Sequence, residues 1–185
     1  QWIFEWAIFP MHVMSVEQVA YESFSHKTLN AIDISGDNMF APFTGHIASF
    51  NRSYGKVIFV SERKVLYADG TIDYMTVELL HASNLDELET LYNNKTIIKQ
   101  GTVFYHQGKT GIYGTPDEKY GIHVEVRVHK GITESNFSGD VYAFDAFWVD
   151  RSITKTIWNW GVCKTGNYLT VSTAPSNWKD RWRLI

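Results

Sequence analysis

Residues 120–129 decide the fold of this chain, because they carry its clearest two-residue alternation: Tyr120-Gly121-Ile122-His123-Val124-Glu125-Val126-Arg127-Val128-His129. The even positions from Ile122 to Val128 are all aliphatic, and the odd positions from His123 to His129 are all polar. Alternation with period two predicts a half-buried strand whose aliphatic row lies on the core. The other face would present ligand-type side chains from a rigid platform, and we expect His123 to be one of three ligands of a catalytic-type zinc.

Length and composition limit the classes of protein to consider. The 185 residues suffice for one well-cored domain, or for one domain with a substantial appendage. A formal net charge of −3, a pI near 6.2 and the lack of any Lys/Arg cluster argue against nucleic-acid recognition. The single cysteine, Cys163, excludes an internal disulfide framework and a Cys-rich zinc cluster. Any metal would therefore be held by histidines and carboxylates.

The sequence shows no membrane or export signal. No apolar run approaches the roughly 20 residues that span a bilayer, so we expect no membrane span. Residues 1–10 contain no Lys or Arg, so we expect no signal peptide there. The chain begins with Gln rather than Met, which is compatible with a piece of a longer protein.

Strand-like patterns separated by turn signals dominate the rest of the chain. The Asp-Gly pair at residues 69–70 predicts the tip of a hairpin over residues 65–74. Residues 84–92 predict the one short helix, with Asn84 as N-cap, acidic residues in the first turn and three leucines on one face. Further strands are expected over residues 30–34, 46–50, 56–60, 75–80, 102–105 and 141–149. The predicted class is mainly β, with an antiparallel sheet because the connections are short.

Two other segments attract attention. Residues 107–116 form a glycine-rich loop, but no phosphate-loop element follows at the right spacing, so we reject phosphate binding there. Five of the seven tryptophans lie between residues 148 and 185. They are expected either to pack on the body or on neighbouring subunits, or to form a stacking surface for glycans or peptides.

Three polar residues lie beside aliphatic rows: His26 just before the first core strand, Asp33 on it, and His123. Two histidines and one carboxylate form the ligand set of a catalytic zinc whose fourth position is left to water or substrate. His81, at the end of another predicted strand, is the natural candidate for a base that stabilises the intermediate. Spacing alone does not separate this site from ordinary hydrogen-bonded histidines, and the HExxH motif of many metalloproteases is absent.

Several motifs follow one another in the order of a known family. They are Phe9-Pro10-Met11, Ser23-Phe24-Ser25-His26-Lys27, Ile32-Asp33-Ile34, Phe40-Ala41-Pro42, Ala68-Asp69-Gly70, His81, Thr110-Gly111-Ile112 and His123-Val124-Glu125. Between Phe9 and Val128 the sequence thereby resembles the lysostaphin/LytM-type zinc endopeptidases, which cut the peptide cross-links of bacterial cell walls. The resemblance is closest to the C-terminal peptidase domain of tail-knob (tail-tip lysin) proteins of short-tailed phages that infect Gram-positive bacteria. The seven-residue step from His26 to Asp33 also fits that phage branch.

The resemblance implies both an architecture and a set of roles. It implies a LytM-like metallopeptidase domain over residues 1–135, with a groove floored by one sheet. Residues 136–185 would form a C-terminal strand and an aromatic-rich extension packed on the same domain. By resemblance, His26, Asp33 and His123 match the Zn²⁺ ligands and His81 a catalytic histidine. The expected partners are peptidoglycan peptides and other phage tail proteins, and the expected location is the virion tail tip, acting on the host cell wall.

One position departs from the family pattern. The family has His-x-His at its last site, whereas this chain has Gly121-Ile122-His123, so the first histidine is missing. Loss of one transition-state donor typically costs about 10²–10³ in rate. Tyr120, Tyr113 and His106 are the nearest candidates in sequence to replace it, and we place Tyr120 with His81 in the catalytic set. The alternative is a catalytically weak or inactive structural tail plug or wall-binding module that still holds zinc.

The remaining polar residues have less specific expectations. Glu125 is expected either to orient a metal ligand or to be an ordinary solvated or paired residue. His129 lies roughly 20 Å farther along the strand than His123 and is expected at the far end of the groove rather than among the ligands. His12 and His46 are expected to be surface or structural residues.

Overall fold

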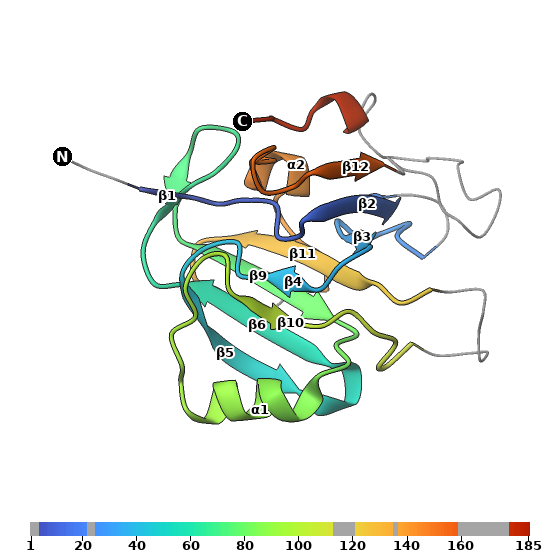
Figure 1. Ribbon diagram of the computed structural model, residues 1–185, viewed down its shortest axis with the longest axis vertical. Helices are drawn as coiled ribbons and strands as arrows, with labels where there is room; N and C mark the ends of the chain where they lie inside the picture. The colour runs from blue at the N-terminus through green and yellow to red at the C-terminus, as the bar shows by residue number, and fades with distance from the viewer. Residues whose placement is uncertain (1–3, 22–24, 113–120, 135–136, 159–177) are drawn as a thin grey trace.

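A seven-stranded sheet forms the centre of the molecule (Figure 1). The structure, a computed structural model, describes residues 4–21, 25–112, 121–134, 137–158 and 178–185. The strand order is β12-β2-β3-β11-β9-β6-β5. These strands are β2 (Val13–Gln18), β3 (Ile32–Ser35), β5 (Gly45–Asn51), β6 (Lys56–Ser61), β9 (Met75–Leu80), β11 (Val124–Lys130) and β12 (Thr156–Trp158). Neighbours pair antiparallel except β12 and β2, which are parallel.

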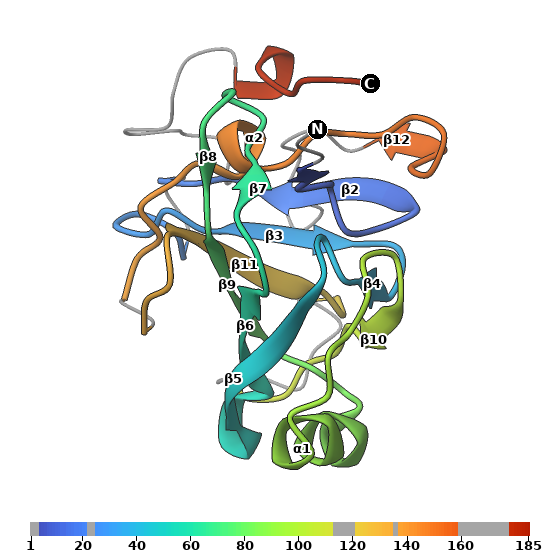
Figure 2. The same cartoon turned by 90° about the vertical axis from the view of Figure 1, so that its left-hand side faces the viewer.

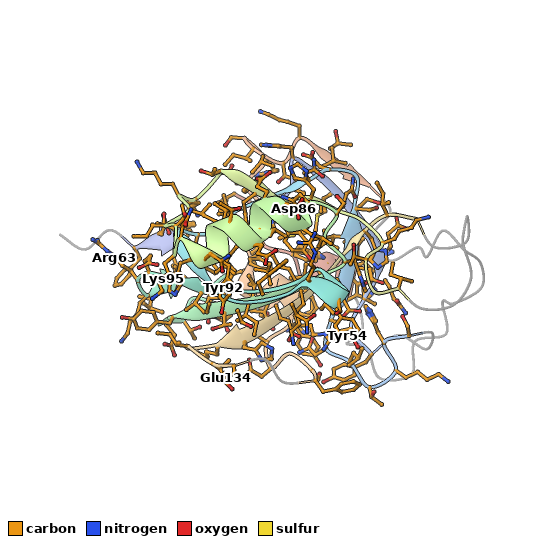
Figure 3. All side chains as sticks on the ribbon, turned by 90° about the horizontal axis from the view of Figure 1, so that it is seen from below. Tyr54, Arg63, Asp86, Tyr92, Lys95 and Glu134 are labelled. Atoms are coloured by element: carbon orange, nitrogen blue, oxygen red, sulfur yellow. The ribbon has the colours of Figure 1, made fainter. Side chains whose placement is uncertain are left out.

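Smaller elements surround this sheet (Figure 2). β1 (Glu5–Trp6), β7 (Val65–Leu66) and β8 (Ile72–Asp73) form a three-stranded sheet, and β4 (Met39–Phe40) pairs with β10 (Val103–Tyr105). The helices are α1 (Leu85–Asn93), α2 (Ala143–Ala146), and the 3₁₀ turns η1 (Arg52–Tyr54) and η2 (Trp178–Asp180). Figure 3, seen from below, looks onto α1, which carries the labelled Asp86 and Tyr92.

The core lies against one face of the sheet. Directly opposed residues of neighbouring strands point to the same face, so Val124 with Ile34 and Val126 with Leu79 continue one apolar surface across three strands. All four side chains are at most 1% exposed. Burial of each such side chain contributes roughly 1.5–3 kcal/mol relative to exposure. The mainly β, antiparallel fold class and the short helix near residues 84–92 are therefore confirmed.

The hairpin prediction is also confirmed. β7 and β8 pair antiparallel, with Val65 opposite Asp73, and the connection passes through Asp69 and Gly70. Gly70 has φ +89°, a left-handed conformation that glycine adopts without the steric cost of a Cβ atom.

Two local predictions are wrong. Ile122 does not continue the buried row, because Val124–Ile34 is the last pair in that register; Ile122 lies outside the strand and is 49% exposed. Residues 141–149 do not form a strand but contain the helical turn α2. Their buried residues are 143, 144, 146, 147 and 149, and the first four have a spacing that places side chains on one side of a helical turn.

The described parts of residues 137–185 contact the main sheet, the core and one another. Val141 bridges Val128 of β11, and Val149 bridges Leu184 near the C-terminus. Trp182 is 6% exposed and Trp178 packs against the core, whereas Trp160 lies outside the described residues. The division of the chain at residue 135 stays a prediction. None of the helices in the described ranges has the length and apolar character needed to cross a membrane.

Candidate metal centre

His26 lies in the connection from β2 to β3 and is fully buried. Its Nδ1 lies 3.2 Å from the carbonyl oxygen of Val19. A carbonyl only accepts hydrogen bonds, so Nδ1 carries the proton and Nε2 of the neutral ring is a bare lone pair. Nε2 lies 3.3 Å from Asp33 Oδ1 and 3.5 Å from Glu125 Oε1. Once deprotonated, the ring therefore presents a ligand atom to two carboxylates.

The two carboxylates come from neighbouring strands. Asp33 on β3 stands directly opposite Glu125 on β11, so both side chains lie on the same face of the sheet. Their side chains are only 13% and 12% exposed. In the amide orientation that satisfies both of its polar atoms, Gln18 donates to Asp33 Oδ2 at 3.1 Å. Like charges in opposed positions are destabilising, so this pair needs a cation between or beside its members.

His123 approaches the same carboxylate from the end of β11. Its Nδ1 lies 2.9 Å from the Gly121 carbonyl oxygen, which fixes the proton on Nδ1. Its Nε2 lies 3.8 Å from Asp33 Oδ2. The His123 side chain is 14% exposed, so the site can be reached from solvent. The groove that the family resemblance implies stays a prediction.

His81 completes the cluster from the end of β9. Its ring centroid lies 5.0 Å from that of His123, with the planes at 66°. Nδ1 of His81 lies 2.9 Å from the Thr110 carbonyl oxygen, so the proton sits on Nδ1 and Nε2 is free to accept one. The residue has φ +82°, a conformation that is uncommon outside glycine and costs of order 1–3 kcal/mol. Such strain clusters at functional sites in proteins.

Two turns hold His81 in this conformation. The amide of His81 donates to the Tyr54 carbonyl, and the Thr110 hydroxyl donates to the Ala82 carbonyl at 2.6 Å. A Cβ atom on Gly108 would come within 2.7 Å of the His81 carbonyl oxygen, so only glycine fits there. Gly108 also exchanges two backbone hydrogen bonds with His123. The glycine-rich segment therefore holds both histidines through Gly108 and Thr110.

The electrostatics of the cluster depend on a positive charge among the carboxylates. Burial by itself lowers the pKa of His26, but the nearby carboxylates of Asp33 and Glu125 outweigh it and raise that pKa from 6.5 to about 10. For Asp33, burial raises the pKa, but the His26 and His123 charges lower it overall to about 2. Burial lowers the pKa of His81 below 6.5, so its ring is neutral at neutral pH.

The donor set fits a metal ion. Nε2 of His26 and Oδ1 of Asp33 are buried without a hydrogen-bond partner. Ligand atoms of His26, Asp33 and Glu125 all lie within 4.8 Å of one another. Imidazole nitrogen and carboxylate oxygen are normal zinc ligands, and one metal ion would give both His26 Nε2 and Asp33 Oδ1 a partner. The structure thus brings Asp33 next to both predicted histidine ligands and adds Glu125 to them.

The polar face of β11 continues beyond Glu125 into a buried charge network. Arg127, His129 and Glu78 lie on this face; Glu78 is 2% exposed and His129 is fully buried. Nε2 of His129 lies 3.6 Å from Glu78 Oε2, and Lys56 Nζ lies 3.1 Å from Glu78 Oε1. The sequence analysis did not predict that these side chains are buried. The available signal was the pair of opposite charges, Glu78 and Arg127, on two predicted strands.

The remaining candidates lie elsewhere or cannot be placed. Tyr120 and Tyr113 lie outside the described residues. His106 directly follows β10; its carbonyl accepts from the Ser83 amide, and its amide donates to Asn84 Oδ1. A Cβ atom added to Gly121 would meet no atom of the described residues within 4 Å. Among the described residues, none blocks a side chain at this position.

Comparison with known sequences finds a similar protein. Over 109 residues the chain is 32% identical to Morphogenesis protein 1 of Bacillus phage B103. The chain is similar to a phage protein. The match covers 57% of this chain and 28% of the relative, so the chain spans less than a third of that protein's length. No family model matches the chain.

A solved structure shows a weaker likeness. The structure of LytU superposes with a TM-score of 0.42 at 16% sequence identity, covering 65% of this chain and 77% of that one.

Proposed function

We propose that this chain is a zinc-dependent endopeptidase of a phage tail tip that cleaves peptide cross-links of Gram-positive peptidoglycan during DNA entry. The observation that carries the proposal is the His26 ring. Its Nδ1 is committed to Val19, and its Nε2 faces Asp33 Oδ1 at 3.3 Å in a buried setting. This contact needs a positive charge: a proton on Nε2 in the metal-free protein, in line with the raised pKa of His26, or a metal ion that displaces that proton.

His26, Asp33 and His123 would hold the Zn²⁺, as the family resemblance implies. Zinc in a site of two histidines and one carboxylate activates water near neutral pH and polarises a peptide carbonyl. Val19 and Gly121 fix the tautomers of the two histidines, so that each presents Nε2 to the carboxylate. Backbone carbonyls thereby orient the ligands from behind.

His81 would act as the base beside this centre. Its neutral ring has Nδ1 committed to Thr110, so Nε2 takes a proton from the attacking group and returns it to the leaving amine. Contacts from residues 107–111 hold the His81 backbone in its strained conformation. The position of the ring is thereby fixed, which reduces its movement during the reaction. Tyr120 would supply a second donor in place of the missing histidine.

Similarity to a phage morphogenesis protein supports the biological setting. In this proposal the chain lies at the tail tip of the virion, in contact with other tail proteins and with the host cell wall. The net charge of −3 agrees with a partner other than nucleic acid.

A release assay on purified peptidoglycan tests the proposal. The wild-type protein with zinc should liberate new amino termini, and His81→Ala should reduce the rate by about 10²–10⁴, the usual contribution of acid–base catalysis. His12→Ala, which alters an exposed histidine on another loop, should leave the rate unchanged. Zinc-loaded protein that releases no termini in either form contradicts the proposal.

The second candidate is a structural tail plug or wall-binding module that holds zinc without cutting. The glycine at position 121 favours it, because this residue has no side chain that can assist the reaction. Wild-type protein that binds zinc and sediments with peptidoglycan, but releases no amino termini, would support this alternative.

A further inference from the structure

Glu125 is held so that only one of its oxygens is available. Oε2 accepts hydrogen bonds from Arg127 Nε at 2.9 Å and from Nη2 at 2.6 Å. Oε1 points the other way and lies 3.5 Å from His26 Nε2. A guanidinium that grips one carboxylate oxygen with two donors leaves little freedom to rotate. The available oxygen is therefore fixed at the metal centre.

Arg127 is itself anchored on the side away from Glu125. Its Nη1 donates to the Phe137 carbonyl at 2.6 Å and lies 3.9 Å from Glu78 Oε1. The Phe137 ring lies 5.8 Å from the guanidinium carbon, within cation–π range. Since the Arg127 side chain is only 11% exposed, solvent screens these contacts little. The position of Glu125 is thus fixed by groups outside the metal centre.

We propose that Glu125 is a fourth protein ligand of the metal, bound through Oε1 alone, and that Arg127 is the residue that positions it. The inference rests on the metal site of the proposed function, but it holds for a peptidase and for a structural protein alike. Zinc ligands at about 2.0–2.2 Å in a tetrahedron stand about 3.3–3.6 Å apart. The His26–Asp33 and His26–Glu125 distances of 3.3 and 3.5 Å match this spacing.

A fourth ligand changes what the site can do. Three protein ligands leave an open position, as in catalytic zinc sites, whereas four form the closed set of structural sites. A second carboxylate also adds negative charge beside the metal, which strengthens binding and weakens the metal's pull on other groups. Four protein ligands would favour tight metal binding, whereas three would leave a position for water or substrate.

Metal binding by purified, metal-stripped protein tests the inference without any activity measurement. Zinc affinity is measured by competition with a chelator, and ligand geometry by the visible absorption of the Co²⁺-loaded protein. Glu125→Gln should weaken zinc binding by more than tenfold and change the Co²⁺ spectrum. Glu125→Asp should do the same, because it keeps the charge but withdraws the oxygen by one methylene. Arg127→Met should weaken binding by about 10–100-fold, the usual effect of losing a residue that orients a ligand.

Glu89→Gln is the matched control. Glu89 is also a glutamate paired with an arginine, 2.9 Å from Arg52, but it lies on α1. This variant should keep wild-type affinity and spectrum. Circular dichroism of the metal-free variants separates loss of a ligand from loss of the fold.

The outcomes distinguish this inference from the proposed function. If His26→Ala abolishes zinc binding while both Glu125 variants keep the wild-type affinity and spectrum, Glu125 is no ligand and the three-ligand site stands. If the Glu125→Asp protein matches wild type but Glu125→Gln does not, only the charge matters, and the inference fails. If the wild-type protein binds no zinc, the inference and the zinc-dependent function fail together.

Discussion

The two faces of β11 are both largely buried, but they are stabilised in different ways. On one face, Val124, Val126 and Val128 are at most 1% exposed and pack on the apolar core. On the other, Glu125 and Arg127 pair with each other within a row of charges that extends to Glu78 on β9. On the apolar face, burial stabilises the fold whatever the orientation of the individual contacts. The charged face is stable only where each group has a partner in the right geometry.

The difference explains where the candidate site lies. Along the charged face, arginine and lysine supply the positive charges opposite Glu78 and Glu125. At the β3 end, Asp33 and Oε1 of Glu125 face the ring of His26, and His26 Nε2 and Asp33 Oδ1 have no hydrogen bond among the described residues. Glu78 Oε2 and the ring nitrogens of His129 also lack one, but Lys56 and Arg127 lie beside Glu78. The family resemblance expects the metal at the β3 end, where histidine rings face Asp33.

Removal of His26 should have the largest effect, because it tests whether the cluster at the β3 end holds a metal. His26→Ala should abolish stoichiometric zinc binding, measured by elemental analysis after dialysis, and with it any peptidase activity. His46→Ala is the control, since His46 pairs with Glu62 at the exposed surface. Unchanged zinc content in the His26→Ala protein would show that the ligand assignment is wrong.

Removal of Glu78 tests the part of the charged face where Lys56 and Arg127 lie beside this carboxylate. Glu78→Ala leaves Arg127 and His129 without their shared carboxylate, and breaking such a buried pair costs about 3–5 kcal/mol. Urea unfolding measures the loss. Glu89→Ala, at the exposed pair with Arg52, should leave the unfolding midpoint unchanged. An equally small effect of both substitutions would remove the contrast between a buried network and a surface pair.

Truncation on the apolar face tests the independence of the two faces. Ile34 is fully buried beside Asp33, and Ile34→Ala should lower the free energy of unfolding by about 2–5 kcal/mol. Zinc bound per folded molecule should stay at the wild-type value, because the change lies on the opposite side of the strand. A loss of zinc affinity in protein that remains folded would show that core packing also positions Asp33.

Restoration of the missing histidine should have the smallest effect. Gly121→His introduces a side chain where no described atom lies within 4 Å of the new Cβ. We expect kcat/KM for a peptidoglycan peptide to rise by about tenfold, or about 1.4 kcal/mol, because the family's second catalytic histidine is regained. Gly121→Ala adds the Cβ without a proton acceptor and should show no gain. Equal gains in both variants would point to backbone rigidity instead.

Much of the fold was predictable from local patterns. The alternation in residues 124–128, the capped leucine pattern of α1 and the Asp69-Gly70 turn each describe a structure formed within a few residues. The errors have local causes too. Residues 141–149 carry apolar residues at both two-residue and helical spacing, and the buried set follows the helical one. Ile122 continues the alternation, but it lies beyond the last strand pair.

The candidate site was predictable only in part. Residue chemistry and family order pointed to His26, Asp33, His81 and His123, and the structure gathers all four around one point. Their roles as ligands and base stay proposals. The pairing of Glu125 with His26 depends on a contact across 99 residues of chain, and no local pattern reveals it. The supporting role of Gly108 is equally non-local, because it depends on which backbone lies against it.

The sequence by itself determined which residues of β11 face the core and which do not, because side chains alternate along any extended strand. It also supplied the ligand-type side chains and left glycine at residue 121. Only the tertiary structure decided that the polar face is buried, that its charges pair from Lys56 to Glu125, and that the pairing ends at His26. The physical reason is that hydrophobic patterning is a property of each strand, whereas charge compensation depends on which strands are neighbours.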